Sequence, residues 1–246
     1  MKFTNQKSPT SLNYIYGRLP ALNTLTSGKV KNVYLQKGFS DEKILATLSH
    51  KGISPKHVDI DTLNKMSGNG NHQGIIVEIY PYEYCSVDSI IESSKRKKQP
   101  LILILDEIED PQNFGAILRS ADAFSVDGVI IKNKNQVPLN WTVAKVSTGA
   151  IEYVKVAQVS NLSNVIKTLK DNGFWIYAAD GSGKDSYEKL DYTGSVALVV
   201  GSEGRGISQL VMKNSDFIIK IPMSGHVNSL NVSVSTGILL SRIRNK

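Results

Sequence analysis

The second half of the chain alternates short apolar runs with segments of helical periodicity. Helical segments such as 114–124 and 162–172 separate the apolar runs. Strands that are apolar on both faces and alternate with helices are typical of a mostly parallel sheet covered by helices. We therefore predict an α/β fold here, with ligands bound where loops leave the carboxyl ends of the strands. The runs expected as strands are residues 101–105, 128–131, 174–179, 196–200 and 217–221.

A polar, basic stretch separates this region from a smaller one that precedes it. Residues 93–100 contain three lysines and one arginine and end in a proline, directly before the apolar run that begins at Leu101. Such a composition is typical of a connection between domains. We predict an N-terminal domain over residues 1–84, a basic linker over 85–100 and a C-terminal domain over 101–246.

The N-terminal region is itself predicted to be a small α/β domain. Residues 33–35 and 74–79 are apolar enough to form strands. Between them, residues 41–51 show a helical pattern, with Ser40 expected as the N-cap and Gly52 directly beyond the end. A domain of about 80 residues lies within the usual size range.

The positive charge of the chain is concentrated in its first hundred residues. Residues 1–100 carry 14 basic and 8 acidic side chains, whereas residues 101–246 carry 15 and 14. Such an excess favours a polyanionic partner such as nucleic acid, although lysine-rich surfaces that only improve solubility have similar numbers. The hydrophobic share of 41% excludes a disordered or collagen-like chain. The charge therefore nominates the N-terminal domain for binding a polyanion.

Cysteine and histidine are too sparse for a disulfide framework or a metal site. Cys85 is the only cysteine, so no intramolecular disulfide can form and a reducing compartment is expected. His50, His57, His72 and His226 are scattered without thiol partners, which argues against a structural zinc. The first residues lack the apolar core of a signal peptide, and no run approaches the roughly 20 apolar residues of a membrane span. These features predict a soluble, cytoplasmic protein with neither a membrane partner nor a metal.

Two glycine-rich loops follow predicted strands, and neither fits a common nucleotide-binding motif. Residues 181–186 read Gly-Ser-Gly-Lys-Asp-Ser, but a P-loop requires glycine where Ala178 stands and serine or threonine where Asp185 stands. Residues 201–206 read Gly-Ser-Glu-Gly-Arg-Gly, which differs from the dinucleotide-binding spacing G-x-G-x-x-G. Taken alone, this second loop is as compatible with a strand-to-helix turn as with a binding site. An NTP-binding role through Lys184 has little support.

Two further segments place many polar residues at predicted strand ends. Residues 106–119 lead into a helix expected to start near Asn113, with Arg119 about one and a half turns later. Arg119 could also be a surface residue paired with Asp122. Residues 221–235 join a strand to a helix whose first turns are crowded with serine and asparagine. Such residues favour caps and turns over helix interiors, and one cap explains only one of them.

Three of these segments together resemble the signature motifs of the SpoU class of the SPOUT superfamily, the RNA ribose 2′-O-methyltransferases that use S-adenosylmethionine. The resemblance rests on residues 110–119, on 201–206, and on 221–223 running into 229–233, in family order and near the family's spacing. Residues 145–152 are similar to the small-residue turn that the family places beside its cofactor. The resemblance implies a trefoil-knot methyltransferase domain with S-adenosyl-L-methionine as cofactor, and a homodimer whose interface borders the cofactor.

The N-terminal region is similar to the small ribosomal-protein-like RNA-binding domain of bacterial 23S rRNA guanosine 2′-O-methyltransferases. This similarity rests on residues 16–17 and 72–76. It implies methylation of a guanosine in 23S rRNA. The alternative enzyme is a tRNA 2′-O-methyltransferase, and the alternative from another class is a non-catalytic RNA-binding ribosome-assembly factor. Because the motif residues Asn113, Arg119 and 229–231 are all present, the catalytic hypothesis is favoured.

The resemblance also implies catalytic roles for individual residues. Asn113 and Ser229 would position the ribose and the reacting groups, and Asn231 would support the same loop. Glu203 would accept a hydrogen bond from a neighbouring arginine or backbone amide, or would only be a favourable carboxylate at a helix start. Arg119 would act as a base, or would bind phosphate and stabilise the developing alkoxide, which better suits a guanidinium that stays protonated.

The resemblance and the charge distribution complete the expected site. The expected cofactor-binding residues are Thr148, Gly149, Gly201, Ile221, Met223, Ser229 and Leu230. The residues expected to contact RNA are Lys29, Lys31, Lys37 and Arg119. Contacts from lysines would read phosphate and shape, so RNA binding is expected to weaken with salt.

Overall fold

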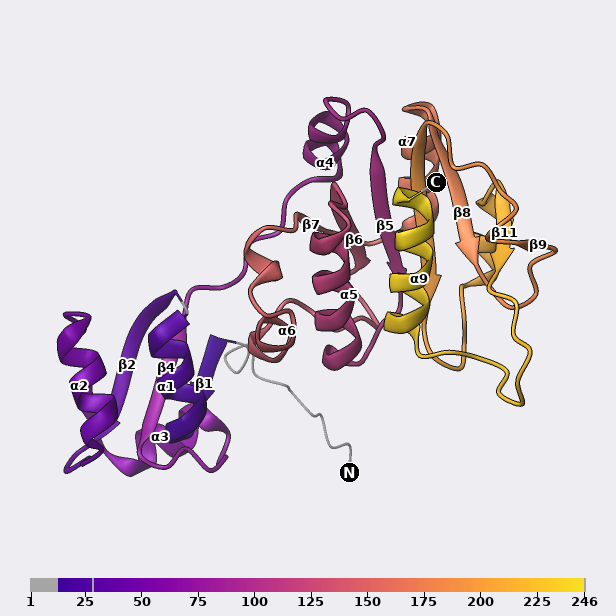
Figure 1. The fold of residues 1–246 in the computed structure, drawn as a ribbon. Coiled ribbons are helices and arrows are strands. Elements are labelled where there is room, and N and C mark those ends of the chain that lie inside the picture. Colours follow the sequence, from indigo (N-terminus) through magenta and orange to yellow (C-terminus); the bar gives the residue numbers. More distant parts are fainter. Residues whose placement is uncertain (1–12, 28, 246) are drawn as a thin grey trace, which may run out of the picture. The chain divides into compact units, whose positions relative to one another are not determined.

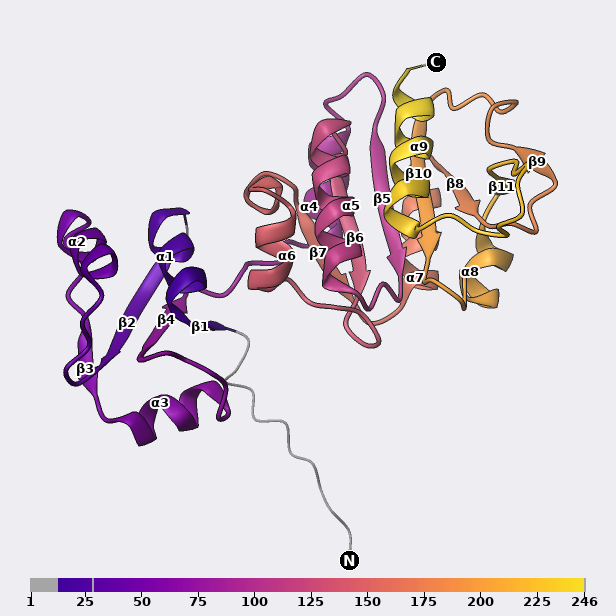
Figure 2. The same cartoon turned by 60° about the horizontal axis from the view of Figure 1, so that its bottom comes forward.

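The computed structural model describes residues 13–27 and 29–245 and divides the chain into two compact units, one ending at Tyr82 and the other beginning at Glu83. Figure 1 and Figure 2 show that each unit has a sheet of its own with helices packed against it. The elements of the first unit are β1 (Tyr14–Tyr16), α1 (Arg18–Ser27), β2 (Val30–Gln36), α2 (Glu42–His50), β3 (Lys56–Val58), α3 (Ile60–Ser67) and β4 (Ile75–Ile79).

The first unit is built on a four-stranded sheet in the order β1-β4-β2-β3. Strand β4 pairs antiparallel with β1 and β2, whereas β3 pairs parallel with β2. The predicted strand 33–35 falls within β2, and the predicted strand 74–79 begins one residue before β4. Apolar side chains of these strands such as Val33 and Val77 are fully buried. Strands β1 and β3 have three residues each and were not predicted, because such short segments show no periodicity. The predicted small α/β architecture is confirmed.

Helix α2 is shorter by one residue at each end than the sequence pattern predicts. The N-cap is Asp41 and not Ser40, since the Asp41 carboxylate accepts a hydrogen bond from the backbone nitrogen of Ile44 at 3.2 Å. Lys51 is the C-cap, and Gly52 follows with a φ of 64°. Serine and aspartate cap helices about equally well, so residue type alone does not distinguish two adjacent candidates.

Glu78 gathers three polar side chains on the sheet of the first unit. It accepts hydrogen bonds from Lys31 Nζ at 2.7 Å, from Asn32 Nδ2 at 2.8 Å and from Tyr34 Oη at 2.9 Å. Burial alone would raise the pKa of Glu78, but the three hydrogen bonds outweigh it and the pKa is lowered. Burial and the hydrogen bond to Glu78 raise the pKa of Tyr34 to about 12. Glu78 therefore stays ionised and holds this part of the sheet surface together.

The second unit contains a seven-stranded sheet in the order β7-β6-β5-β10-β8-β11-β9. All its neighbouring strands pair in parallel, which confirms the predicted architecture. The two outermost strands, β7 and β9, were not predicted because they are short and include polar residues. The elements are α4 (Val87–Ser94), β5 (Leu101–Asp106), α5 (Pro111–Ala123), β6 (Gly128–Lys132), α6 (Trp141–Val146), η2 (Ala150–Glu152), β7 (Val156–Val159), α7 (Leu162–Asp171), β8 (Phe174–Ala179), β9 (Asp185–Ser186), β10 (Ser195–Gly201), α8 (Gln209–Asn214), β11 (Phe217–Lys220) and α9 (Val232–Arg244).

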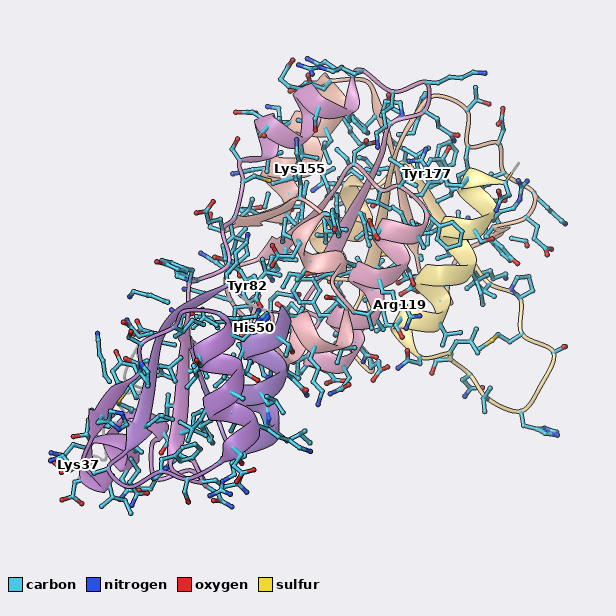
Figure 3. The ribbon with its side chains drawn as sticks, turned by 60° about the vertical axis from the view of Figure 1, so that its left-hand side comes forward. Lys37, His50, Tyr82, Arg119, Lys155 and Tyr177 are labelled. Carbon is cyan, nitrogen blue, oxygen red and sulfur yellow. The ribbon has the colours of Figure 1, made fainter. Side chains whose placement is uncertain are left out.

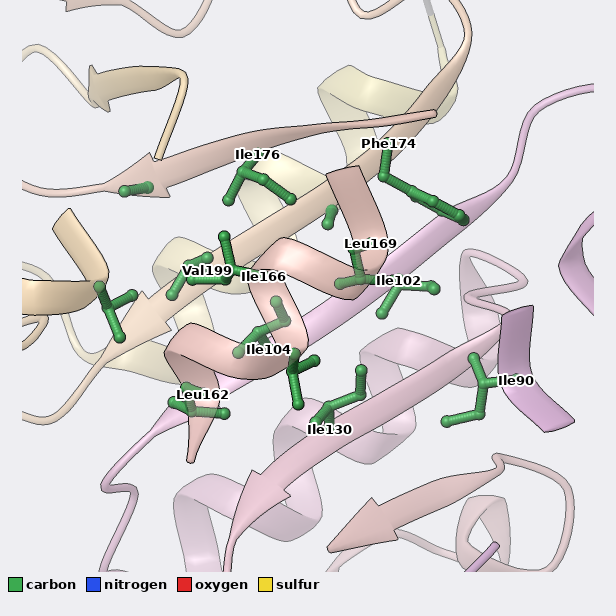
Figure 4. Close-up of a cluster of buried hydrophobic side chains, with 14 of the residues drawn as sticks. Ile90, Ile102, Ile104, Ile130, Leu162, Ile166, Leu169, Phe174, Ile176 and Val199 are labelled. Carbon is green, nitrogen blue, oxygen red and sulfur yellow. The ribbon is translucent and has the colours of Figure 1, made fainter. Parts of the chain in front are cut away.

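Helices cover both faces of this sheet. Helices α4, α7 and α8 pack on one face, where side chains such as Ile102, Ile166 and Leu169 form the core shown in Figure 4. Helices α5, α6 and α9 lie on the other face, with α5 between α6 and α9 (Figure 1, Figure 2). Helices α5 and α9, which carry two of the signature motifs, are therefore neighbours.

The segment 85–100, predicted as a basic linker, belongs to the second unit. It contains helix α4, whose N-cap Ser86 accepts a hydrogen bond from the backbone nitrogen of Ser89 at 3.1 Å. Ile90 and Ile91 of this helix are 0% and 2% exposed in the core. The basic run on which the linker prediction was based comes after the helix. The prediction relied on the composition of that run and did not take account of the two isoleucines before it.

Helix α5 begins two residues earlier than predicted. Asp110 is the N-cap, accepting a hydrogen bond from Gln112 N at 3.0 Å, and Pro111 occupies the first helical position, where its missing N–H costs nothing. Further along, a Cβ on Gly115 would lie 2.5 Å from Cβ of Val146. Glycine at this position therefore allows α5 to pack closely against α6.

The loop that partly resembles a P-loop places β9 beside β11. A Cβ on Gly183 would lie 2.7 Å from the carbonyl carbon of Ile219, so only glycine fits there. Asp185 and Ser186 then pair with β11. Packing accounts for this glycine, which removes the main reason to consider an NTP-binding role.

Candidate functional site

A pocket of about 1130 Å³ opens at the carboxyl edge of the parallel sheet in the second unit. It lies where β8, β10 and β11 end and where α9 begins, as expected for ligand sites in open parallel sheets. Seven of the residues predicted for the site line it, namely Gly201, Glu203, Ile221, Met223, Ser229, Leu230 and Asn231. These residues come from two motif segments, 201–206 and 221–233.

The loop 201–206 forms one wall of the pocket and is closed on itself. Ser202 N donates to Gly206 O at 3.1 Å, and Gly206 N donates to Ser202 O at 3.0 Å. A Cβ on Gly201 would lie 2.2 Å from the carbonyl carbon of Gly206. Gly204 and Gly206 have φ values of 89° and 66°, which favour glycine. The glycines are thus required by the loop's own packing, and Gly201, Gly204 and Gly206 present only backbone to the pocket.

Asn231 connects the three motif segments. Its Oδ1 caps α9 by accepting hydrogen bonds from Ser233 N at 2.9 Å and Val234 N at 3.4 Å. Its Nδ2 donates to Asn113 Oδ1 at 2.8 Å and to Glu203 Oε1 at 2.7 Å. Because Asn113 is on α5 and Glu203 is in the glycine loop, one side chain links α5, α9 and the loop.

Glu203 is held by groups at the start of α9. Besides Asn231, it accepts a hydrogen bond from the backbone nitrogen of Val232 at 3.4 Å. The expected backbone amide partner is therefore found, but the neighbouring Arg205 turns away and pairs with Glu107 at 3.3 Å and Glu109 at 2.5 Å. Glu203 thus closes the pocket wall against α9 and is not engaged by an arginine.

Replacing Asn231 separates its capping role from its linking role. Asn231→Ser keeps an oxygen that caps α9 but loses the two Nδ2 bonds, and is expected to cost about 1 kcal/mol of unfolding free energy. Asn231→Asp also keeps the cap, but it turns an oxygen toward Asn113 Oδ1 and Glu203 Oε1, and is expected to cost about 1 kcal/mol more. Urea unfolding of both variants at neutral pH checks this order. Wild-type stability of Asn231→Ser would show that the Nδ2 bonds contribute nothing, and equal stability of the two variants would show that the added oxygen of Asn231→Asp is not repelled.

Thr148 and Gly149 do not reach the pocket. They form an exposed turn between α6 and η2, with φ values of 50° and 94°. The turn follows α6, and α5 lies between α6 and α9, the helix that begins at the pocket (Figure 1). These two residues are therefore outside the lining of this pocket, and their role in cofactor binding stays a prediction.

Arg119 also lies outside the pocket lining. It is exposed on α5, in the position labelled in Figure 3. Six helical positions separate it from Asn113, which rotates the two side chains by about 120° relative to each other. Asn113 is 7% exposed and bonded to Asn231, whereas Arg119 points to solvent. One chain does not bring these two predicted catalytic residues together.

Carboxylates after β5 brace the glycine loop from outside the pocket. Asp106 is 1% exposed, and its Oδ2 accepts a hydrogen bond from the backbone nitrogen of Ser208 at 2.8 Å. Lys132 Nζ lies 3.7 Å from Asp106 Oδ1 and donates a hydrogen bond to Glu107 at 2.6 Å. The hydrogen bond from Lys132 lowers the pKa of Glu107. Sequence reasoning missed this cluster, because its members are far apart along the chain.

The three lysines predicted to contact RNA lie on the first unit, at or next to β2. Lys31 pairs with Glu78 at 2.7 Å and Lys37 with Asp59 at 2.9 Å, and Lys37 is labelled in Figure 3. Lys29 lies just before β2, where its carbonyl accepts a hydrogen bond from Tyr80 N. The Lys37–Asp59 pair is exposed on both sides and such pairs are weak, whereas the Glu78 carboxylate that pairs with Lys31 is only 13% exposed.

Several lining residues were not predicted from the sequence. Asp180, Ser202 and Lys220 line the pocket. Ser202 Oγ is buried and has no hydrogen-bond partner within residues 13–27 and 29–245. Asp180 could have been found, because it directly follows the predicted strand 174–179, where ligand-binding side chains are expected.

No group of three or more histidine, cysteine or carboxylate side chains in the described part of the chain could hold a metal ion. No helix in that part of the chain is long and apolar enough to cross a membrane.

Comparison with known families gives two matches that together span most of the chain. Residues 100–241 match the SpoU rRNA Methylase family. Residues 14–85 match the family described as RNA 2′-O ribose methyltransferase substrate binding. The boundary between the matches lies close to the boundary between the two compact units.

Individual proteins give a consistent comparison. A TrmH family tRNA/rRNA methyltransferase from Staphylococcus aureus (strain COL) is 43% identical over 227 residues, covering 90% of this chain and 91% of that protein. The relative YacO from Bacillus subtilis (strain 168) is 37% identical over 95% of this chain and 96% of its own length. An AdoMet-bound rRNA methyltransferase from Sinorhizobium meliloti has the same fold, with a TM-score of 0.67, 23% identity, and coverage of 95% of this chain and 87% of that chain.

Proposed function

Because the chain belongs to the SpoU rRNA methylase family, we propose that it is an enzyme that transfers a methyl group from S-adenosyl-L-methionine to a ribose 2′-hydroxyl of RNA. The observation that carries this proposal is the hydrogen-bond network that joins Asn113, Asn231 and Glu203 at the edge of one pocket. A non-catalytic RNA-binding factor would not need the residues of three separate motifs to meet at such a pocket.

The pocket suits this cofactor in size and chemistry. Its volume of about 1130 Å³ reaches the upper end of usual ligand sites, so an extended nucleoside with an amino-acid tail fits. The three glycines of the loop 201–206 allow a ligand to approach the backbone closely. Asp180, Glu203 and Lys220 offer partners to a ligand that carries both positive and negative groups, and Ser202 Oγ offers a free donor and acceptor.

Methyl transfer to a hydroxyl is an in-line displacement, so the protein must align the two reactants and assist loss of the hydroxyl proton. The bound cofactor supplies an electrophilic methyl group on a sulfonium. We assign Asn113, Ser229 and Asn231 to hold the ribose and the reacting atoms, with Glu203 fixing Asn231. Arg119 would bind the adjacent phosphate and stabilise negative charge as it develops on the hydroxyl oxygen, since a guanidinium remains protonated.

The position of Arg119 supports the homodimer that the family resemblance implies. Arg119 is exposed and lies outside the pocket lining of its own chain. A second copy packed against α5 and α9 would bring Arg119 next to the partner's pocket and would also place Thr148 and Gly149 near an interface. The trefoil knot is also a prediction from the family resemblance.

We propose that a guanosine of 23S rRNA is the substrate and that the first unit binds it, which implies a cytoplasmic location. The match of residues 14–85 to a substrate-binding family supports RNA capture by this unit. Lys29, Lys31 and Lys37 are the proposed phosphate contacts. The alternative substrate is tRNA, which the relatives' names also allow.

Incubation with labelled S-adenosylmethionine tests the proposal. We expect label in 23S rRNA and little in total tRNA, with the modified nucleotide identified as a 2′-O-methyl group by nuclease resistance. Transfer should fall with added salt as lysine–phosphate contacts weaken. Label in tRNA alone would support the alternative substrate. Label in neither pool by a protein that binds the cofactor would contradict both RNA assignments.

A further inference from the structure

Asp180 is a carboxylate that lines the pocket and directly follows a central strand of the sheet. It comes immediately after β8, which lies between β10, the strand that leads into the glycine loop, and β11. Its backbone nitrogen donates to Ile219 O of β11 at 2.9 Å, and its carbonyl accepts from Gly183 N at 3.0 Å. The residue is therefore anchored on both sides by backbone hydrogen bonds.

The two oxygens of the Asp180 carboxylate have different surroundings. Oδ1 accepts two hydrogen bonds from Ser182, one from its backbone nitrogen at 2.9 Å and one from its Oγ at 2.6 Å. Oδ2 accepts no hydrogen bond from residues 13–27 and 29–245, and it lies 3.2 Å from the position that a Cβ on Gly206 would take. The side chain is thus fixed in one orientation, with one acceptor facing the glycine loop.

Asp180 and the proposed reacting groups lie on different sides of β10 in the order of the strands. Asn113, Asn231 and Glu203 gather where the glycine loop meets α5 and α9, on the β5 side of β10. Asp180 lies on the opposite, β8 side of β10. A group that binds there contacts a part of the cofactor remote from the methyl group.

An acceptor in this position has a known use in nucleoside recognition. In open parallel sheets that bind dinucleotides, a carboxylate at a strand end near the glycine-rich loop accepts a hydrogen bond from a ribose hydroxyl. The oriented Oδ2 beside Gly206 of the glycine loop offers the same chemistry here. We propose that Asp180 Oδ2 accepts a hydrogen bond from a ribose hydroxyl of the adenosyl group and thereby sets cofactor affinity. This inference rests on the proposed cofactor.

Calorimetric binding of three nucleosides tests the contact without any RNA. S-adenosylmethionine, S-adenosylhomocysteine and 5′-methylthioadenosine all carry the ribose, but the second has a neutral sulfur and the third lacks the ammonium as well. We expect Asp180→Asn to weaken binding of all three by a similar factor of about tenfold, as for loss of one hydrogen bond to a charged acceptor. Asp185→Asn removes the same charge from an exposed position in β9, outside the lining, and should leave all three affinities unchanged.

A cycle with deoxy analogues identifies the ribose as the partner. For the wild-type protein, the 2′-deoxy or the 3′-deoxy form of 5′-methylthioadenosine should bind about tenfold more weakly than 5′-methylthioadenosine itself. For Asp180→Asn, the deoxy form and 5′-methylthioadenosine should bind with equal affinity, because the partner of the hydroxyl is already lost. In turnover, Asp180→Asn should raise KM for the cofactor and leave kcat unchanged, because the contact is remote from the methyl group. Thermal unfolding without ligand shows whether Asp180→Asn is folded. Ser182→Ala is a second variant, which keeps both carboxylate oxygens of Asp180 and should lose less affinity for the nucleosides.

Any of the following results would overturn the inference about Asp180. A loss for the two amino-acid-bearing ligands but not for 5′-methylthioadenosine would place the contact at the ammonium group. A loss for S-adenosylmethionine alone would indicate attraction to the sulfonium. Unchanged affinity for all three would remove Asp180 from the site while leaving the proposed function intact. Failure of the wild-type protein to bind any of the three would overturn the proposed function itself.

Discussion

Replacing Arg119 with alanine is expected to lower the rate of methyl transfer by about 10²–10³-fold, the loss typical of removing one preorganised donor from a developing negative charge. The fold should be unaffected, because the side chain is exposed on α5 and makes no hydrogen bond or ion pair within residues 13–27 and 29–245. Single-turnover rates with saturating RNA, measured beside RNA affinity, separate a role in the chemical step from a role in binding.

Two further variants sharpen the Arg119 test. Arg119→Lys keeps the charge but loses the planar, bidentate donor set, so most of the activity should still be lost. Lys167→Ala removes a positive charge from α7, on the opposite face of the sheet, and should keep normal activity. Normal transfer by Arg119→Lys would mean that charge alone suffices. Normal transfer by Arg119→Ala would exclude the residue from both proposed roles.

Replacing Gly201 with alanine is expected to have the largest effect on stability. The added Cβ would lie 2.2 Å from the carbonyl carbon of Gly206, and further backbone atoms of the loop lie within 2.4 Å. Because the obstacle is backbone and not a flexible side chain, the loop must move, at a cost of about 3 kcal/mol or more of unfolding free energy. The same movement would displace the pocket wall, so cofactor binding should be lost as well.

Gly225→Ala is the matched control for this substitution. Gly225 lines the same pocket, but a Cβ there meets no atom within 4 Å and its φ is not positive. Urea unfolding should therefore show a change of less than about 0.5 kcal/mol for Gly225→Ala. Equal stability of Gly201→Ala and the wild-type protein would contradict the tight closure of the loop.

Much of the fold could be predicted because apolar runs of five or six residues have a clear pattern. The central strands β5, β8 and β10 are buried along most of their length, and their sequences are almost continuously apolar. Short edge strands such as β7 carry no such pattern and were missed. Helix α4 was missed for another reason, since its buried Ile90 and Ile91 stand directly before a strongly basic run.

Some residues of the candidate site could also be predicted from the sequence, and others could not. Gly201 and Asn231 were expected at the site by resemblance, and both line the pocket, one at the end of a strand and the other at the start of a helix. Thr148 and Arg119 were expected at the site by resemblance, but neither lines the pocket of one chain, because α6 and the exposed face of α5 lie away from it. Asp180 was overlooked because a single carboxylate after a strand is common.

The sequence by itself determined the kinds of side chain that stand at the carboxyl ends of the strands, because periodicity and capping depend on residues close together in the chain. Only the tertiary structure decided that Asn231 would bond both Glu203, 28 positions earlier, and Asn113, 118 positions earlier. Those contacts depend on the order of the strands, which inserts β10 between β5 and β8 and so brings the glycine loop beside α5 and α9. Hydrogen bonds over such separations depend on the packing of the whole sheet, which no local pattern contains.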